Sequence, residues 1–240
     1  MLCSISDLRN LRLTALDGNI GVVDDFYFEE ATWTIRYIVV DTGGWLRGRL
    51  VLLSPASVTV IDRVNGHMEV NLTRAQVENS PGIDAHQTVS RQHEMELAKY
   101  YDWPSYWSEP VYRDWKPFTT LVRTQEPPTP STEAGPTLRS LQEVTGYHIH
   151  ATDDKIGHLD DFIVRDEDWG IRYLVVDTRN WLPGKRVLVA PEWVTGIHFT
   201  GQYIDVNLTR DAISKAPRYD PGSFMTTHQE KQLMEETKVS

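Results

Sequence analysis

Apolar and polar residues alternate along this chain in short runs, a pattern typical of β-strands. Leu11, Leu13 and Ala15 alternate with polar residues before a turn at 17–19, which predicts a first strand. Similar runs, separated by turn residues such as Asn65-Gly66 and Pro55, predict five more. These strands are expected at 20–28, 34–41, 49–53, 57–62 and 67–71.

The expected strand at 34–41 is apolar on both faces. Alternation would put Ile35, Tyr37 and Val39 on one face, with Ile38 and Val40 on the other. A strand that is buried on both sides favours a strongly curved sheet or a closed barrel over an open sheet with one wet face.

The whole pattern occurs twice. A shift of 136 residues lays 20–81 on 156–217 without a gap, and close to half of the positions are identical. We therefore expect a mainly β chain of two tandem six-stranded β-barrels, each followed by short helices. The first domain is expected at 1–123 and the second at 138–240, with a proline-rich linker at 124–137. Approximate two-fold packing of the repeats, or a homodimer, would follow from the duplication.

Helices are expected only after the strands of each repeat. Thr73 and Gln76 have the spacing of a capping box, which predicts a short helix ending before Pro81. A second helix is expected at about 90–101, and a matching one near Thr227 in the second repeat.

Composition narrows the functional classes. No apolar run reaches the 18 residues of a membrane-spanning helix, so direct membrane insertion is not expected. The net charge of −10, with no basic run, argues against nucleic-acid binding. A single cysteine, Cys3, and an N-terminus without the features of a secretory signal favour a cytoplasmic location.

Two repeated features suggest chemistry or recognition. The pairs Asp24-Asp25 and Asp160-Asp161 could serve acid–base or metal chemistry, or one member could cap a turn or pair with Arg36 or Arg172 while the other meets water. Trp45 and Trp181 lie in glycine-containing loops, where an indole either anchors a partner or folds over the barrel end. The candidate partner-binding residues are Trp45, Trp181, Arg36, Arg172, Trp103 and Trp107.

The stretch 100–118 is rich in aromatic residues. These side chains must cover the barrel of their own repeat, the sister repeat or a second chain, or bind an external partner.

A further candidate is a metal site at His148, His150 and His158, because alternate residues share a strand face. The alternative is that these are ordinary surface histidines. No cofactor is expected. The chain has no Gly-x-Ser-x-Gly elbow and no glycine-rich phosphate loop, which favours a non-enzyme.

Several of the repeated motifs resemble the PRC-barrel family. These are Gly-x-Val-Asp-Asp-Phe at 21–26, Arg-Tyr-Ile-Val-Val-Asp-Thr at 36–42, the Pro55 turn and Val-Asn-Leu-Thr-Arg at 70–74, with counterparts in the second repeat. The run from Tyr100 to Trp107 is similar to the tail of bacterial stand-alone members. The family includes the cytoplasmic part of the H subunit of purple-bacterial photosynthetic reaction centres and a ribosome maturation factor.

The resemblance implies a small six-stranded barrel that docks on another protein or complex, and no catalytic residues to carry over. The leading expectation is therefore a non-catalytic adaptor or assembly module. The alternatives are a small-molecule or metal sensor and, by analogy with the reaction centre, a soluble accessory of a photosynthetic or respiratory electron-transport complex.

Overall fold

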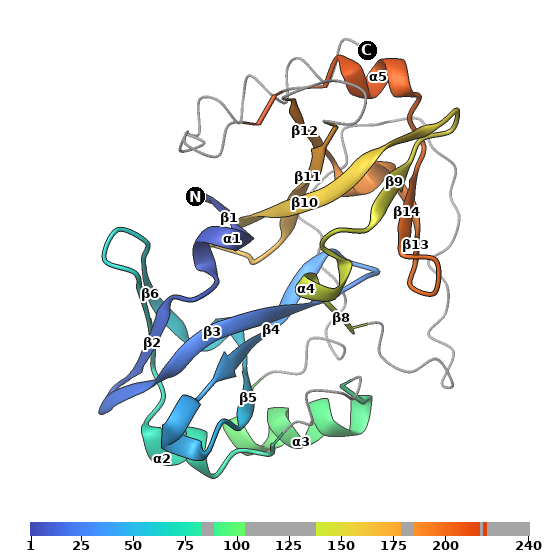
Figure 1. Ribbon diagram of the computed structural model, residues 1–240. Coiled ribbons are helices and arrows are strands. Elements are labelled where there is room, and N and C mark those ends of the chain that lie inside the picture. Colours follow the sequence, from blue (N-terminus) through green and yellow to red (C-terminus); the bar gives the residue numbers. More distant parts are fainter. Residues whose placement is uncertain (83–88, 104–137, 179–184, 217, 220–240) are drawn as a thin grey trace.

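A computed structural model describes residues 1–82, 89–103, 138–178, 185–216 and 218–219. The expected mainly β class is confirmed, because the described residues form two seven-stranded sheets with a few short helices (Figure 1). The 124–137 linker, Trp107 and the helix expected near Thr227 lie outside the described residues.

The first repeat supplies six strands that follow one another around the first sheet. They are β2 (Arg12–Ala15), β3 (Gly18–Glu29), β4 (Thr34–Asp41), β5 (Leu50–Leu53), β6 (Val58–Asp62) and β7 (His67–Val70), in the sheet order β5-β4-β3-β2-β7-β6. All neighbours are antiparallel except β2 and β7. The connecting elements are η1 (Gly43–Leu46), η2 (Pro55–Ser57) and α2 (Arg74–Glu78).

The second repeat has the same strand order. Its strands are β9 (His148–His150), β10 (Lys155–Arg165), β11 (Ile171–Asp177), β12 (Arg186–Val189), β13 (Val194–His198) and β14 (Tyr203–Val206), in the order β12-β11-β10-β9-β14-β13. The connecting elements are η3 (Pro191–Trp193) and α5 (Arg210–Ser214). The duplication read from the sequence is therefore a duplication of structure.

The seventh strand of each sheet comes from the other repeat. β1 (Leu2–Ser4) runs antiparallel to β10, and β8 (Leu138–Ser140) runs antiparallel to β3. Each exchanged strand leads into a single helical turn, α1 (Ile5–Leu8) or α4 (Leu141–Val144). Figure 1 shows β1 and α1 against β10, and α4 beside the first sheet. The alternation pattern did not predict these strands.

The expected closed barrels are not observed. Among the described residues β5 and β6 do not pair, and they are the two edges of the first sheet. The chain leaves β5 through η2, whose Pro55 has no backbone N–H to donate. The two sheets share one apolar core, which contains buried residues of both repeats, including Phe26, Phe28 and Phe162. Each repeat therefore covers apolar residues of the other, which a closed barrel would have covered by itself.

The two apolar faces of β4 contact different layers. Ile38 and Val40 belong to the shared core, whereas Tyr37 and Val39 lie on the outer face of the sheet. Ile35 also belongs to the core, so the expectation that it shares a face with Tyr37 was wrong. A register shift between β3 and β4 lies between these two residues and reverses the alternation.

Helix α3 (Arg91–Tyr101) covers the outer face of the first sheet (Figure 1). It begins after Ser90, whose hydroxyl accepts a hydrogen bond from the His93 amide, as expected for a helix starting near residue 90. Its Leu97 is fully buried in the apolar cluster of that face. Glu94 is also fully buried, and it accepts a hydrogen bond from the Tyr37 hydroxyl at 3.2 Å.

The expected capping box at Thr73 and Gln76 is confirmed at the start of α2. No helix among the described residues is both long enough and apolar enough to cross a membrane.

Candidate functional site

Asp25 and Asp161 hold the exchanged segments in place. Asp25 accepts hydrogen bonds from the Ser140 hydroxyl at 2.5 Å and from the Gln142 amide at 3.0 Å, at the start of α4. Asp161 accepts from the hydroxyls of Ser4 and Ser6 in the same way at α1. One aspartate of each pair therefore caps a helical turn, which was one of the alternatives left open by the sequence.

The two caps are buried. Burial raises the pKa of Asp25 and of Asp161, against the lowering effect of the hydrogen bonds from the serine hydroxyls. Their neighbours Asp24 and Asp160 are half-buried, and Asp160 lies 2.8 Å from Arg186. Members of a pair thus contact different groups and do not act as one chelating unit.

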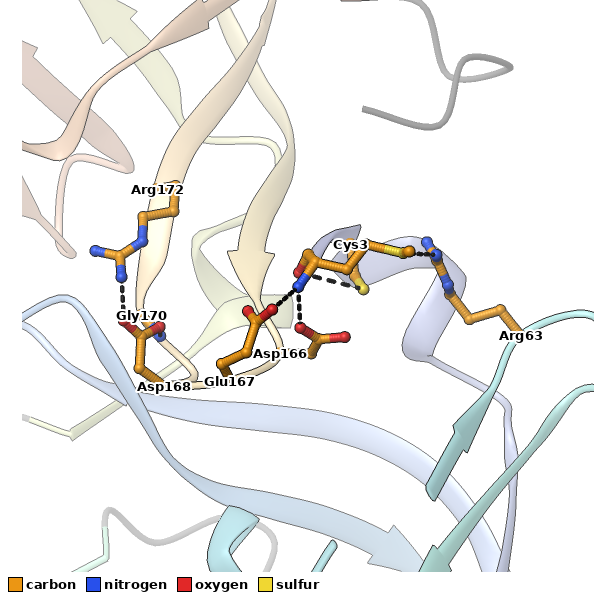
Figure 2. Close-up of polar contacts among 8 residues, drawn as sticks. Cys3, Arg63, Asp166, Glu167, Asp168, Gly170 and Arg172 are labelled. Atoms are coloured by element: carbon orange, nitrogen blue, oxygen red, sulfur yellow. Dashed lines mark hydrogen bonds and ion pairs between the residues drawn. The ribbon is translucent and has the colours of Figure 1, made fainter. Parts of the chain in front are cut away.

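Arg36 and Arg172 have carboxylate partners within their own hairpins. Arg36 Nη2 donates to Glu29 Oε2 at 2.6 Å, and Arg172 pairs with Asp168 (Figure 2). Both arginine side chains are largely buried, with 18% of each exposed. They were candidates for partner binding, and in the structure they brace the β3–β4 and β10–β11 hairpins.

These hairpins meet each other through Trp33 and Trp169. The Ile35 amide donates to the Trp169 carbonyl at 2.9 Å, and the Ile171 amide donates to the Trp33 carbonyl at 2.7 Å. The Trp33 ring stacks on Phe28, with centroids 5.3 Å apart. The reciprocal contacts are the two-fold packing expected from the duplication.

The start of the chain is fixed to the β10–β11 hairpin. The Met1 amino group contacts the carboxylates of Asp166 and Glu167, and Arg63 Nη2 lies 3.0 Å from the Met1 sulfur (Figure 2). Desolvation lowers the pKa of the amine, but the hydrogen bonds to both carboxylates raise it above its ordinary value overall. The same contact lowers the pKa of Glu167 to about 2. These contacts tie the residue before β1 to the second repeat.

Trp45 lies in η1 at one end of the first sheet. Its ring is half-buried, and the Arg74 guanidinium carbon lies 4.5 Å from the ring centroid. Asp17 accepts a hydrogen bond from the Arg74 amide at 2.7 Å, which fixes the start of α2 against the β2–β3 turn. The Arg74 side chain also passes close to Gly18. This arrangement holds the cation and the indole together at the surface.

Apolar and cationic side chains surround this pair. Leu16 is 71% exposed, Leu46 is half-buried and Arg47 is exposed. We call this set the Trp45 surface, and its members are Leu16, Trp45, Leu46, Arg47 and Arg74. Trp45 was predicted from the sequence. The contribution of Arg74 was missed, although its recurrence beside the cap at Thr73 was a signal in the repeat.

The other predicted aromatic residues lie elsewhere. Trp181 and Trp107 fall outside the described residues. Trp103 stacks on Tyr101 with ring centroids 4.1 Å apart, and both pack against the outer cluster of the first sheet. Burial there raises the pKa of Tyr101 to about 12. The described part of the aromatic stretch thus covers its own repeat.

The three candidate metal-binding histidines do not form one group. His150 stacks on Tyr203, with ring centroids 4.5 Å apart, and its Nδ1 lies 3.7 Å from Asp205. His148 is exposed on β9. Within the described part of the chain, a single group of three potential metal ligands is found, and it joins His158 to Asp160 and Asp177.

Comparison with known families finds a similarity in the first repeat. The fold defines a tandem-repeat, mainly β protein whose halves exchange strands. Residues 3–77 match the family model of the PRC-barrel domain. The second repeat, which that match does not cover, has the same strand order. Comparison with curated proteins found no relative of the chain.

Proposed function

We propose that this protein is a non-catalytic adaptor that docks on another protein through the Trp45 surface. The PRC-barrel domain at 3–77 supports the general class, since it suggests a family of protein-interaction modules. The observation that carries the proposal is the pairing of Trp45 with Arg74 beside the exposed Leu16. Tryptophan and arginine are the residues most enriched at binding hot spots.

The surface is pre-organised for binding. Arg74 is fixed by the Asp17 cap, and η1 is closed by a hydrogen bond from the Gly43 amide to Asp41 Oδ1 at 2.8 Å. Side chains that are already ordered lose less entropy when a partner binds. The mixture of apolar groups with the cations Arg47 and Arg74 fits a partner surface that is apolar with acidic groups around it.

Reciprocal strand exchange supports an adaptor role in a second way. Because each repeat contributes a strand to the sheet of the other, the loops of both repeats belong to one folded unit, which suits a scaffold for assembly. The free thiol of Cys3 agrees with action in the cytoplasm, which we include in the proposal.

Crosslinking in a lysate of the native host tests the proposal. Wild type, Trp45→Ala, Arg47→Glu and Val64→Asp are compared by mass spectrometry of the crosslinked proteins. Val64 is 89% exposed in the β6–β7 turn, so Val64→Asp is a surface control outside the Trp45 surface. We expect one stoichiometric partner with wild type and with the control, and its loss with Trp45→Ala and Arg47→Glu.

Folding of each variant is checked by circular dichroism before the comparison. A partner that crosslinks equally to folded wild type and folded Trp45→Ala would contradict docking through this surface. An absence of any stoichiometric partner for wild type would contradict the adaptor function itself.

A further inference from the structure

A histidine and two aspartates meet on the outer face of the second sheet. His158 of β10 is directly opposite Asp177 of β11, and Asp160 is two residues along β10 from His158. Leu159 is fully buried in the shared core, and Asp160 is the extra residue of a β-bulge between Leu159 and Asp161, which turns its carboxylate toward His158. The ligand atoms of these three residues all lie within 4.8 Å of one another.

This spacing is close to that of a metal centre. Nitrogen and oxygen ligands about 2.1 Å from one ion lie within roughly 4.3 Å of each other, so small side-chain rotations suffice. One imidazole and two carboxylates suit divalent first-row transition metals. His148 is the register partner of His158 on β9 but does not belong to this group of three.

The first repeat provides an internal comparison. The positions equivalent to His158, Asp160 and Asp177 hold Val22, Asp24 and Asp41, so the carboxylates recur and the imidazole does not. His158 is therefore the one potential ligand of this group of three that the first repeat lacks.

A metal ion would compete with the Arg186 guanidinium for the Asp160 carboxylate. Arg186 Nε lies 2.8 Å from Asp160 Oδ2 but makes no hydrogen bond, so the contact is electrostatic. Arg186 also lies directly opposite Asp177 in the strand register of β11 and β12. The first repeat has Leu50 at this position. The guanidinium therefore neutralises the Asp160 carboxylate here, and removing it would leave that charge for a metal ion.

We propose that His158, Asp160 and Asp177 form a binding site for a divalent first-row transition-metal ion, present in the second repeat and not in the first. The site lies apart from the Trp45 surface, which belongs to the first repeat. The proposal therefore does not depend on the adaptor function.

Zinc titration of the full chain tests the site. Chelator-treated protein is titrated with Zn²⁺ by isothermal calorimetry, and wild type is expected to bind one ion per chain. His158→Val, which introduces the residue of the first repeat, should weaken binding by at least about tenfold. Arg186→Leu should tighten it, since the competing guanidinium is gone. His67→Ala is the control, because His67 also lies near two carboxylates, Asp62 and Glu69, in the first repeat.

A gain of function completes the test. Val22→His supplies the missing imidazole beside Asp24 and Asp41, and we expect it to raise the stoichiometry to two ions per chain. Circular dichroism confirms that each variant is folded. No binding by wild type, unchanged binding by His158→Val, or a stoichiometry that stays at one in Val22→His would each overturn the proposal.

Discussion

The Asp25 carboxylate accepts a hydrogen bond from the Ser140 hydroxyl, although the two residues are 115 positions apart. The same contact recurs between Asp161 and Ser4 after a shift of 136 residues. Each buried aspartate thus caps the helical turn that follows the strand donated by the other repeat. The aspartates repeated in the sequence therefore stabilise the junction between the repeats.

Asp25→Ala should destabilise the fold by about 1 to 3 kcal/mol, because it leaves the Ser140 hydroxyl and the Gln142 amide without their acceptor. Urea denaturation followed by tryptophan fluorescence measures this loss. Asp24→Ala is the matched control, since it removes the neighbouring half-buried carboxylate and should change the free energy of unfolding by less than about 0.5 kcal/mol. Equal effects of the two substitutions would contradict the capping role.

The raised pKa values of Asp25 and Asp161 give stability a defined pH dependence. The folded state holds these protons more tightly than the unfolded state, so their contribution is largest below the unfolded value of about 4 and declines as pH rises through the raised folded pKa. The double variant Asp25→Asn, Asp161→Asn lacks both titrations. The free energy of unfolding of wild type minus that of the double variant should fall with rising pH across this window, and a rise would show that the sign is wrong.

Gly21 and Gly157 are identical in the two repeats because the backbone approaches closely there. A Cβ on Gly21 would lie 2.1 Å from the Asp41 carbonyl oxygen, and its φ of +148° is unfavourable for other residues. Gly21→Ala should therefore cost roughly 3 kcal/mol or more. Gly44→Ala is the control, since a Cβ there would meet no atom within 4 Å. Thermal unfolding that gives the two variants the same midpoint would contradict this close approach.

Glu94 should be the residue of α3 most sensitive to truncation. It is fully buried between the Tyr37 hydroxyl and Arg91, whose Nη1 lies 3.2 Å away, so Glu94→Ala should cost about 3 to 5 kcal/mol. Glu94→Gln keeps an acceptor for Tyr37 and should cost less. Glu96→Ala, at an exposed position of the same helix, should be near neutral. Chemical denaturation measures the free energy of unfolding of the three variants. An unchanged free energy of unfolding in Glu94→Ala would contradict the buried contact.

The repeats and most strands could be predicted from the sequence because alternation and turn residues act locally. The boundaries of β4 and the cap at Thr73 are examples. The exchange of β1 and β8 could not be predicted in this way, because three-residue strands carry almost no alternation and their partners lie in the other repeat. A hint was present upstream of the aligned repeat, where Leu2 and Ser4 recur as Leu138 and Ser140.

In the candidate sites, too, single residues could be predicted from the sequence, whereas their contacts with distant residues could not. Trp45 was recognisable because it recurs in a glycine-containing loop, but the placement of Arg74 over its ring depends on how α2 meets η1. His158 was singled out by its spacing from His148 and His150. Its neighbours Asp160 and Asp177 could be joined to it only once the register of β10 and β11 was known.

Each repeat completes the sheet of the other, and a designed disulfide tests this exchange of strands. Cys3 is directly opposite Val164 in the pairing of β1 with β10, and both side chains lie in the shared core. Directly opposite residues of antiparallel strands are close enough for a disulfide. Val164→Cys is combined with a protease site introduced within 124–137, and Val51→Cys, in the first repeat itself, is the control.

After mild oxidation and cleavage, non-reducing electrophoresis of Val164→Cys should show one band at the 27.5 kDa of the intact chain, which a reductant splits into two fragments. The Val51→Cys control should give two fragments under both conditions. Two fragments from oxidised Val164→Cys, with both thiols still free, would contradict the strand exchange on which this account rests.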